Sequence, residues 1–473
     1  MFQFLLNREV VSADLPHGTV LLDFIRRRRG LAGTKEGCRE GDCGACMVLL
    51  GEPLENGLAY RPVNSCLVPL AEAEGRHVVT IEGLNRDALT PVQQAFVDEG
   101  AAQCGFCTPG FMLSLAGFLL SSPRWDGDAA NEAIGGNLCR CTGYIAIRRA
   151  LAKVCARLSN EIAAPAGSAE RVRQLVAGGW LPDDFLSAAG IVNGLQCGGT
   201  QIALGHVPPV LVAGGTDLFV QRGDELESAP MDLLSRRAHL RGIRMENGVC
   251  VIGAATPLAD LEDSEALRAV LPGLERHLRL VASRPIRNRA TLAGNLVNAS
   301  PIGDLAILLL ALDARLTLGD EAGRRVVQLR DFFLGYKVID RRPDELVLEI
   351  EFDPPPPDAV LGFEKVSRRT HLDIAAVNSA MLAVARDGRI STMRLSVGGV
   401  APVPKFLQQT CAMLTGAEIT PAVLRGALDA ADDEIAPISD VRGSADYKRN
   451  LLRRLLVAHF QKLSPEAAEE LLP

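Results

Sequence analysis

The cysteines of this chain are concentrated near its beginning. Of its 12 cysteines, eight lie within the first 141 residues, where they form two groups of four. The segment Met1–Phe4 shows no basic stretch followed by an apolar run, so we expect no secretory signal and a cytoplasmic protein. In that compartment, closely paired cysteines hold metals or carry out redox chemistry more often than they form disulfides. The sequence therefore predicts two metal centres in this part of the chain.

Four cysteines with the spacing C-x4-C-x2-C-x19-C make up the first group: Cys38, Cys43, Cys46 and Cys66. Their first three positions match the plant-type spacing of a [2Fe–2S] cluster. A loop that wraps closely around two irons needs residues without bulk, and several lie here: Gly37, Gly41, Gly44 and Ala45. A structural zinc site is the alternative, but zinc sites usually show two C-x2-C-like pairs. The flanking pattern of strands over residues 2–11, 47–50 and 78–82, with a helix over 19–29, resembles the β-grasp fold of ferredoxins.

Four further cysteines with the spacing C-x2-C-x31-C-x-C make up the second group: Cys104, Cys107, Cys139 and Cys141. The surrounding residues predict four helices, over residues 91–99, 109–120, 129–134 and 145–158. Helix N-termini near the thiolates would stabilise their negative charge. Taken alone, this spacing also fits zinc. Beside a ferredoxin-like loop, it favours a second [2Fe–2S] cluster.

Two strings further along the chain are rich in small and hydrogen-bonding residues. Leu211–Asp217 has the pattern of a strand that runs into a Gly-Gly turn, whose N–H groups could bind a phosphate. The string over residues 287–304 contains many polar side chains, which need partners when they are buried. A pyrophosphate and a ribityl chain would supply those partners, whereas an ordinary turn and a polar loop are the alternatives. Since there is no G-x-G-x-x-G, a Rossmann site is not indicated.

Together, the two cysteine motifs and the two polar strings resemble the iron–sulfur and flavin part of the molybdenum hydroxylases. That family includes xanthine dehydrogenase, aldehyde oxidase and carbon monoxide dehydrogenase. The resemblance implies an α+β multidomain chain: a β-grasp [2Fe–2S] ferredoxin domain (1–84), a four-helix [2Fe–2S] domain (85–159), a linker (160–180), a mixed α/β FAD-binding domain (181–357) and a C-terminal α/β flavoprotein subdomain (358–473).

The resemblance also implies roles for individual residues. Cys38, Cys43, Cys46 and Cys66 would hold the cluster nearer the surface, and Cys104, Cys107, Cys139 and Cys141 the one nearer the molybdenum. The residues expected to line FAD are Leu211, Val212, Ala213, Gly214, Gly215, Thr216, Asp217, Asn295, Asn298, Ser300, Asp304 and Lys365. Among them, Asp304 would bind the ribose or adenine end and Lys365 would lie near the isoalloxazine. Val281 stands where several relatives carry an aromatic residue.

With both cluster motifs and the flavin strings on one chain, the sequence resembles the small subunits of bacterial xanthine dehydrogenases within this family. This implies electron transfer from a molybdopterin centre through two [2Fe–2S] clusters to FAD and on to NAD. The molybdopterin would lie on a large partner subunit, in an (αβ)2 heterotetramer, and we expect no substrate-activating residues on this chain. The alternatives are the same role in an aldehyde- or N-heterocycle-oxidising relative, and a zinc-binding adaptor.

Charge and hydropathy exclude two other classes. The net charge is −7 and aromatic residues make up only 4%, which disfavours a nucleic-acid-binding module. The longest uncharged stretches are interrupted by Gly, Pro and amide residues, so they do not provide the roughly 20 consecutive apolar residues of a membrane span. We therefore expect neither nucleic acid nor membrane as a partner.

Overall fold

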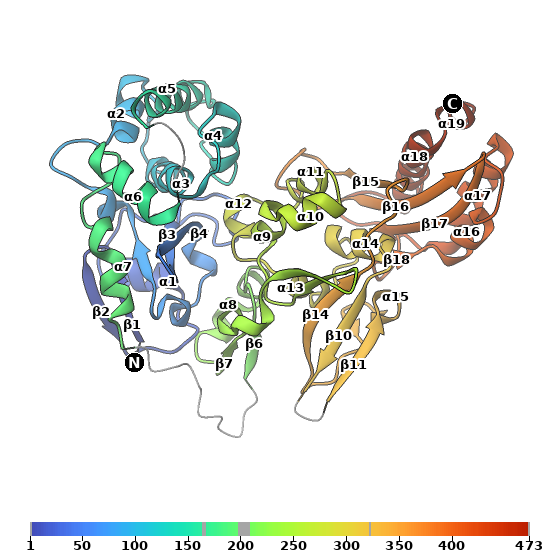
Figure 1. The fold of residues 1–473 in the computed structure, drawn as a ribbon, viewed down its shortest axis with the longest axis horizontal. Coiled ribbons are helices and arrows are strands. Elements are labelled where there is room, and N and C mark those ends of the chain that lie inside the picture. Colours follow the sequence, from blue (N-terminus) through green and yellow to red (C-terminus); the bar gives the residue numbers. More distant parts are fainter. Residues whose placement is uncertain (1, 163–166, 197–208, 321–322, 472–473) are drawn as a thin grey trace. The chain divides into compact units, whose positions relative to one another are not determined.

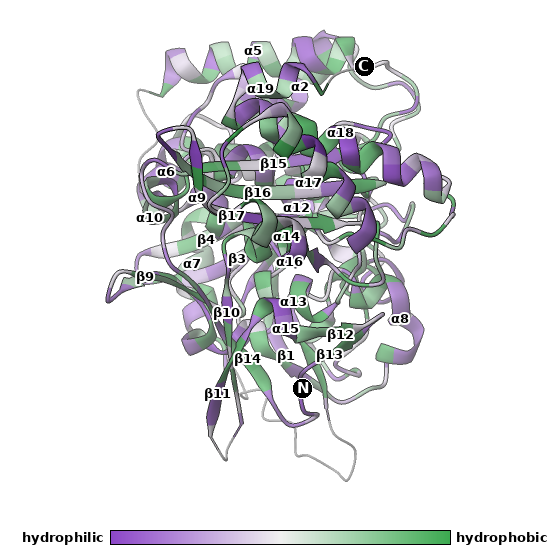
Figure 2. Ribbon diagram, turned by 90° about the vertical axis from the view of Figure 1, so that its right-hand side faces the viewer, coloured by the Kyte–Doolittle hydropathy of each residue, from purple (hydrophilic) through white to green (hydrophobic). Residues whose placement is uncertain are grey.

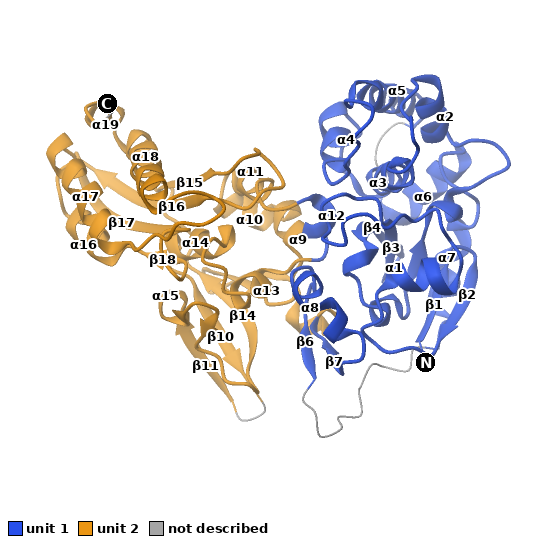
Figure 3. Ribbon diagram, turned by 180° about the vertical axis from the view of Figure 1, so that it is seen from behind, with its two compact units in different colours: residues 1–234, 283–289 blue, residues 235–282, 290–473 orange. Residues whose placement is uncertain are grey.

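The computed structural model describes residues 2–162, 167–196, 209–320 and 323–471. It divides into two compact units (Figure 3). Unit 1 contains residues 1–234 and 283–289, and unit 2 contains residues 235–282 and 290–473. The short segment 283–289 therefore belongs to unit 1, although its neighbours on both sides in the sequence belong to unit 2.

Unit 1 begins with a mixed five-stranded sheet in the order β2-β1-β5-β3-β4. Strands β1 to β4 are labelled in Figure 1. Its strands are β1 (Phe2–Leu6), β2 (Glu9–Ala13), β3 (Met47–Leu54), β4 (Gly57–Asn64) and β5 (His77–Val79). The single strand expected over residues 2–11 is a hairpin, which turns at Asn7 with a φ of 54°. Helix α1 (Leu21–Asp23) continues into a π-helical segment, Phe24–Arg28, whose apolar residues join the core of the sheet. The expected β-grasp ferredoxin fold is thus confirmed.

The next part of unit 1 consists of the four expected helices: α2 (Pro91–Asp98), α3 (Thr108–Ser121), α4 (Gly127–Ala133) and α5 (Ile145–Glu161). Thr90 is the N-cap residue of α2 and forms a capping box with Gln93. Helix α3 is buried along almost its whole length. Apolar and polar residues alternate along α5 (Figure 2), and Ile147, Leu151 and Leu158 lie on its buried face.

The structure differs from the expected linker over residues 160–180, because α6 (Ser168–Ala177) forms within it. Leu175 and Trp180 are buried in the same core as α3 and α5, and the Trp180 indole donates to Glu161 Oε2 at 2.9 Å. Burial of these side chains stabilises the helix. The helix was not expected, because the flanking residues have the composition of a linker. Unit 1 continues with α7 (Phe185–Asn193), β6 (Val210–Val212), α8 (Leu218–Leu226) and β7 (Met231–Leu233).

Unit 2 contains two main sheets, in the orders β11-β10-β14-β9-β8 and β15-β16-β17-β18, and a small β12-β13 hairpin. The strands are β8 (Ile243–Glu246), β9 (Val249–Gly253), β10 (Arg315–Gly319), β11 (Arg324–Gln328), β12 (Phe333–Gly335), β13 (Val338–Ile339), β14 (Leu346–Phe352), β15 (Val360–Val366), β16 (Val377–Arg386), β17 (Arg389–Gly398) and β18 (Lys405–Phe406).

The helices of unit 2 are α9 (Leu258–Asp263), α10 (Glu265–Val270), α11 (Leu274–Leu278), α13 (Leu292–Val297), α14 (Asp304–Ala311), α15 (Leu329–Phe332), α16 (Gln408–Leu414), α17 (Pro421–Glu434), α18 (Ala445–Leu463) and α19 (Pro465–Glu469). Helix α14 is buried from Leu305 to Ala311 and packs against β16 and β17, while α18 packs against β15 and β16. The expected multidomain α+β class is confirmed.

Within the described part of the chain, no helix is both long enough and apolar enough to span a lipid bilayer.

Candidate functional site

The first group of cysteines lies around the start of β3 and the end of β4. Cys38 and Cys43 lie in the loop before β3, Cys46 immediately precedes that strand, and Cys66 lies in the 3-10 turn after β4. The sulfurs of Cys46 and Cys66 are 3.3 Å apart, and the Cys43 thiol hydrogen-bonds to Cys38. The four thiols therefore approach one another as two pairs.

Hydrogen bonding favours the thiolate form on one member of each pair. The hydrogen bond between Cys38 and Cys43 lowers the pKa of Cys38 to about 5, and the one between Cys46 and Cys66 lowers the pKa of Cys46. Backbone N–H groups also point at the sulfurs, since Glu40 donates to Cys38 Sγ at 3.3 Å. Thiolates are the form that binds iron, and N–H donors disperse their negative charge.

Glycine is required where the loop passes closest to other groups. A Cβ on Gly37 would lie 2.8 Å from Cys43 Sγ. Gly44 has a φ of +68°, and a Cβ there would lie 2.4 Å from the carbonyl oxygen of Gly136. These close approaches form a cradle that suits a cluster wrapped by backbone.

The second group lies on two loops at helix ends. Cys107 is the N-cap residue of α3 and Cys104 precedes it, while Cys139 and Cys141 lie between α4 and α5. The sulfurs of Cys104 and Cys141 are 3.6 Å apart, and Cys107 hydrogen-bonds with Cys139. Burial, followed by the bond with Cys139, raises the pKa of Cys107 to about 12. These four thiols also form two pairs.

Thr142 supports the second group from outside. Its hydroxyl donates to Cys139 Sγ at 3.1 Å. Burial raises the pKa of the Cys139 thiol, but this bond and neighbouring N–H groups outweigh burial and lower the pKa overall. The hydroxyl therefore favours the thiolate of Cys139.

The pairing of the thiols fits one of the two kinds of metal centre better than the other. A [2Fe–2S] cluster takes two protein ligands on each iron, whereas a structural zinc ion draws four ligands to one point. Each group presents its sulfurs two by two, and this arrangement fits a two-iron cluster.

The two groups are joined through backbone. Leu138 N–H donates to the carbonyl oxygen of Cys43 at 2.9 Å, and Asn137 Nδ2 donates to the carbonyl oxygen of Gly44 at 3.3 Å. Ser114, which is buried on α3, donates to Asn137 Oδ1 at 2.7 Å and fixes the amide. The loop of the first group therefore lies directly against the loop of the second.

The first predicted flavin string, Leu211–Asp217, belongs to unit 1. It comprises the end of β6, a turn in which Gly215 has a φ of +74°, and Asp217, the N-cap residue of α8. Arg289 donates to the carbonyl oxygen of Gly214 at 3.1 Å and holds the turn. The turn thus has the expected small-residue geometry.

The other predicted flavin residues belong to unit 2. Asn295 lies in α13, Asn298 at its C-terminal end and Ser300 in the loop that follows, while Asp304 begins α14 and Lys365 lies on β15. The structure brings Asp304 and Lys365 together in an ion pair of 2.7 Å. Burial raises the pKa of Asp304, although the Lys365 charge acts in the opposite direction.

Two amide oxygens flank this ion pair without a protein partner. Asn295 Oδ1 and Asn378 Oδ1 are both buried and accept no hydrogen bond in the described structure. Asn378 Nδ2 donates to Asp304 Oδ1 at 2.6 Å, and a Cβ on Gly303 would lie 3.6 Å from Asn295 Oδ1. Orphaned acceptors of this kind suit a ligand with hydroxyl or amide donors, and a flavin nucleotide carries both.

Sequence reasoning missed two residues at this site. Asn378 lies in an apolar strand, and a polar side chain within such a run is the signal that could have identified it. Lys337 donates to the backbone oxygen and Oδ1 of Asn298, at 2.7 Å in both cases. Val281, at the position of the expected aromatic residue, packs against the apolar core of unit 2.

Comparisons with known families cover most of the chain. The 2Fe-2S iron-sulfur cluster binding domain matches residues 4–71, and the [2Fe-2S] binding domain matches residues 80–152. The FAD binding domain in molybdopterin dehydrogenase matches residues 200–355, and the CO dehydrogenase flavoprotein C-terminal domain matches residues 363–463. Two [2Fe–2S] domains followed by an FAD-binding domain define an iron–sulfur flavoprotein that transfers electrons.

Individual relatives agree. Over 95% of its length, the chain is 28% identical to xanthine dehydrogenase of Emericella nidulans, of which it covers 38%. Over 97% of its length, the chain is 26% identical to aldehyde oxidase 1 of Bos taurus, and it covers 39% of that protein. The solved structure of a carbon monoxide dehydrogenase from Hydrogenophaga pseudoflava, 30% identical, matches 55% of this chain and 90% of that chain with a TM-score of 0.51.

The chain belongs to the molybdenum hydroxylase family, of which it carries the iron–sulfur and FAD-binding part. It spans about two fifths of the length of the curated relatives it matches.

Proposed function

We propose that this chain is the electron-transfer subunit of a xanthine dehydrogenase. It would receive electrons from a molybdopterin centre on a large partner subunit, in an (αβ)2 heterotetramer, during hydroxylation of hypoxanthine and xanthine to urate. NAD would be the final acceptor. The same role in a relative that oxidises an aldehyde or an N-heterocycle is the second candidate, favoured by the similarity to aldehyde oxidase 1.

The observation that carries the proposal is the pair of cysteine groups joined by the bond from Leu138 N–H to the Cys43 carbonyl. Both groups lie in unit 1, on a chain that also has an FAD-binding domain. The similarity to xanthine dehydrogenase extends over 95% of the chain, whereas the carbon monoxide dehydrogenase chain matches 55% of it. This difference in coverage favours the xanthine dehydrogenase type.

When bound, [2Fe–2S] clusters carry single electrons, and FAD combines two of them for transfer to NAD. The chain's own residues hold and tune these groups. Cysteine thiolates supply the ligands, and the N–H of Glu40 and the hydroxyl of Thr142 disperse the charge on the sulfurs. The contact between Leu138 and Cys43 keeps the two ligand sets at a fixed separation. In unit 2, the orphaned oxygens of Asn295 and Asn378 would accept hydrogen bonds from FAD.

The first test is the composition of the purified chain. If two clusters are present, we expect about four irons and four sulfides per chain, together with one FAD. The chain should also show the visible absorption of the clusters and of the flavin. Cys38→Ser and Cys104→Ser should each remove one of two cluster signals, whereas Cys155→Ser, a buried cysteine of α5, should remove neither. A colourless chain that binds zinc after anaerobic reconstitution would overturn the proposal.

The substrate is tested on the enzyme assembled with its molybdenum-binding partner. NAD reduction should depend on xanthine or hypoxanthine and release urate. Turnover with an aldehyde or an N-heterocycle, but with neither purine, would replace xanthine by the second candidate. If the enzyme reduced oxygen but not NAD, NAD as the final acceptor would be overturned and the rest of the proposal would stand.

A further inference from the structure

The segment 283–289 belongs to unit 1, and the side chains of Arg287, Asn288 and Arg289 contact other residues of that unit. It contains α12 (Arg284–Arg287), which lies against β4. Asn288 Nδ2 donates to the carbonyl oxygen of Pro62 at 2.9 Å, and Arg289 forms an ion pair of 3.1 Å with the fully buried Glu72. Arg287, itself 3% exposed, lies 3.5 Å from Glu132. Buried polar contacts of this kind are lost at substantial cost, so the segment is firmly held.

Ile286 is the residue of this segment that faces the first cysteine group. A Cβ on Gly41 would lie only 2.5 Å from Ile286 Cδ1, so the isoleucine side chain covers the backbone of Gly41. Ile286 also packs against the apolar core that contains Cys46 and Cys66. The N–H of Gly41 is one of the groups that hydrogen-bond to the Cys66 sulfur. The isoleucine therefore lies over a donor to a cluster ligand.

We propose that Ile286 is a positioning residue that shields the first cluster from water and thereby lowers its reduction potential. Reduction adds negative charge to the cluster, and water stabilises added charge better than an aliphatic side chain does. The covering segment arrives from a distant part of the sequence, between two stretches of unit 2. This inference rests on the proposed function, because it requires a [2Fe–2S] cluster on Cys38, Cys43, Cys46 and Cys66.

The test compares two substitutions that have nearly the same shape. In the full chain, Ile286→Val keeps the site apolar, while Ile286→Thr places a hydroxyl in the same volume. Potentials of both clusters are measured by anaerobic redox titration with electron paramagnetic resonance, and the Cys104→Ser variant identifies the signal of the first cluster. We expect the first-cluster potential to be higher with threonine than with valine, and higher still with Ile286→Ala. The second-cluster potential should stay unchanged.

Ile191→Ala provides the matched control, because Ile191 is a half-buried isoleucine of α7 that packs against a different core of unit 1. It should shift neither potential. The inference is overturned if threonine and valine give the same first-cluster potential, or if both clusters shift together in every variant. The proposed function fails separately, since a parent chain without two [2Fe–2S] signals would show that no such cluster exists.

Discussion

The backbone N–H of Leu138 donates to the carbonyl oxygen of Cys43 at 2.9 Å. Cys43 is a member of the first cysteine group, and Leu138 directly precedes Cys139 of the second group in the sequence. This bond, together with the one from Asn137 Nδ2 to the Gly44 carbonyl oxygen, links the loops of the two cysteine groups. The small residues around it are what allow the two loops to come so close.

Gly44→Ala should separate the two loops. Its φ of +68° disfavours any Cβ, and the added atom would lie 2.4 Å from the Gly136 carbonyl oxygen. We expect a loss of about 1–3 kcal/mol in the free energy of unfolding, together with reduced iron content. Urea denaturation and iron analysis measure the two effects. Gly127→Ala is the control, because a Cβ there meets nothing within 4 Å; equal iron content in both variants would contradict the prediction.

Thr142→Val should change the second cluster alone. The Thr142 hydroxyl donates to Cys139 Sγ at 3.1 Å, and hydrogen bonds to ligand sulfurs stabilise the reduced state. We expect a lower reduction potential for the second cluster and an unchanged one for the first. Thr415→Val removes a hydroxyl that donates to the Cys411 carbonyl oxygen in unit 2, and it should leave the reduction potentials of both clusters unchanged. If Thr142→Val shifted the potential of the first cluster as much as that of the second, the assignment of Thr142 to the second cluster would be refuted.

Much of unit 1 could be predicted from the sequence, because its signals are local. Cysteine spacing, glycines between ligands and apolar periodicity predict the β-grasp fold and the four helices, and the structure confirms both. Helix α6 was not predicted, because the residues before it have the composition of a linker. Its stability comes from the packing of Leu175 into a core that other helices form. The hairpin turn at Asn7 had a local signal that was overlooked, because the polar residues 7–9 interrupt the apolar residues on either side.

The protein partners of the residues predicted to line FAD could not be predicted, because those partners lie far away in the sequence. Asp304 and Lys365 were expected at opposite ends of FAD, yet they pair across 61 residues. The contact of Arg289 with Glu72 likewise depends on a segment that joins unit 1 from within the sequence of unit 2. Residue type predicts that a buried charge needs a partner but leaves open which residue supplies it.

Lys365→Met should destabilise unit 2 and weaken FAD binding. Lys365 and Asp304 are only 3% and 10% exposed, so the substitution leaves a buried carboxyl without its cation. Breaking such a pair costs about 3–5 kcal/mol. Thermal unfolding and the FAD content of the purified chain measure the effect, and adding Asp304→Asn should restore part of the stability. Lys462→Met, which breaks the partly exposed pair between Lys462 of α18 and Glu364 of β15, should cost under about 1 kcal/mol. Similar losses in the two variants would contradict the prediction.

His459→Gln should make unit 2 less sensitive to acid. His459 is fully buried beside Ser379, and burial, followed by the Lys462 charge, lowers its pKa to about 3. Because the unfolded chain takes up a proton near pH 6.5 and the folded one does not, stability is retained above that pH and falls as pH drops toward 3. At pH 5 the loss is about 2 kcal/mol.

Urea unfolding at pH 7 and pH 5 measures this difference. The parent should lose more stability between the two pH values than the His459→Gln variant does. His239→Gln, at an exposed histidine, should keep the parent's pH dependence. If both variants lose stability in parallel with the parent, His459 is not the group responsible.

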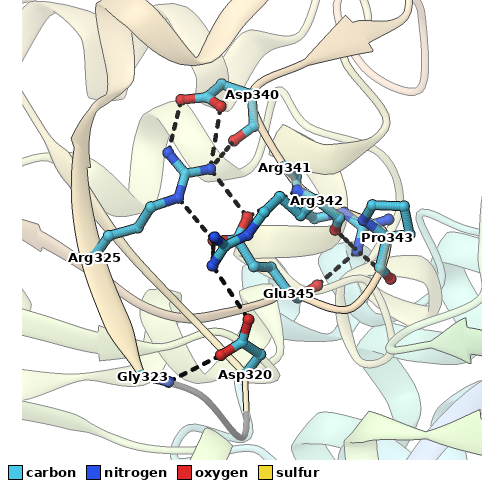
Figure 4. A network of polar contacts seen from close by, with 8 residues as sticks. All are labelled: Asp320, Gly323, Arg325, Asp340, Arg341, Arg342, Pro343 and Glu345. Carbon is cyan, nitrogen blue, oxygen red and sulfur yellow. Dashed lines mark hydrogen bonds and ion pairs between the residues drawn. The ribbon is translucent and has the colours of Figure 1, made fainter.

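Glu345→Gln should weaken the polar network that joins β11 to the loop before β14 (Figure 4). The Glu345 carboxylate is fully buried, accepts from Arg325 at 2.7 and 2.9 Å, and lies 2.9 Å from Arg342. The hydrogen bond from Arg325 is the main cause that lowers the pKa of Glu345 to about 2. We expect the amide to cost about 1–3 kcal/mol at pH 7.

The pH dependence of that loss provides the sharper test. The folded carboxyl titrates lower than the unfolded one, so its stabilisation is present above pH 4.5 and fades as pH falls toward 2. The gap in unfolding free energy between parent and Glu345→Gln should therefore narrow between pH 7 and pH 3.5. Glu246→Gln removes an exposed partner of Arg244 and should cost less than about 1 kcal/mol at either pH. A gap at Glu345 that stays constant across this range would show that lost packing, rather than lost charge, explains the effect.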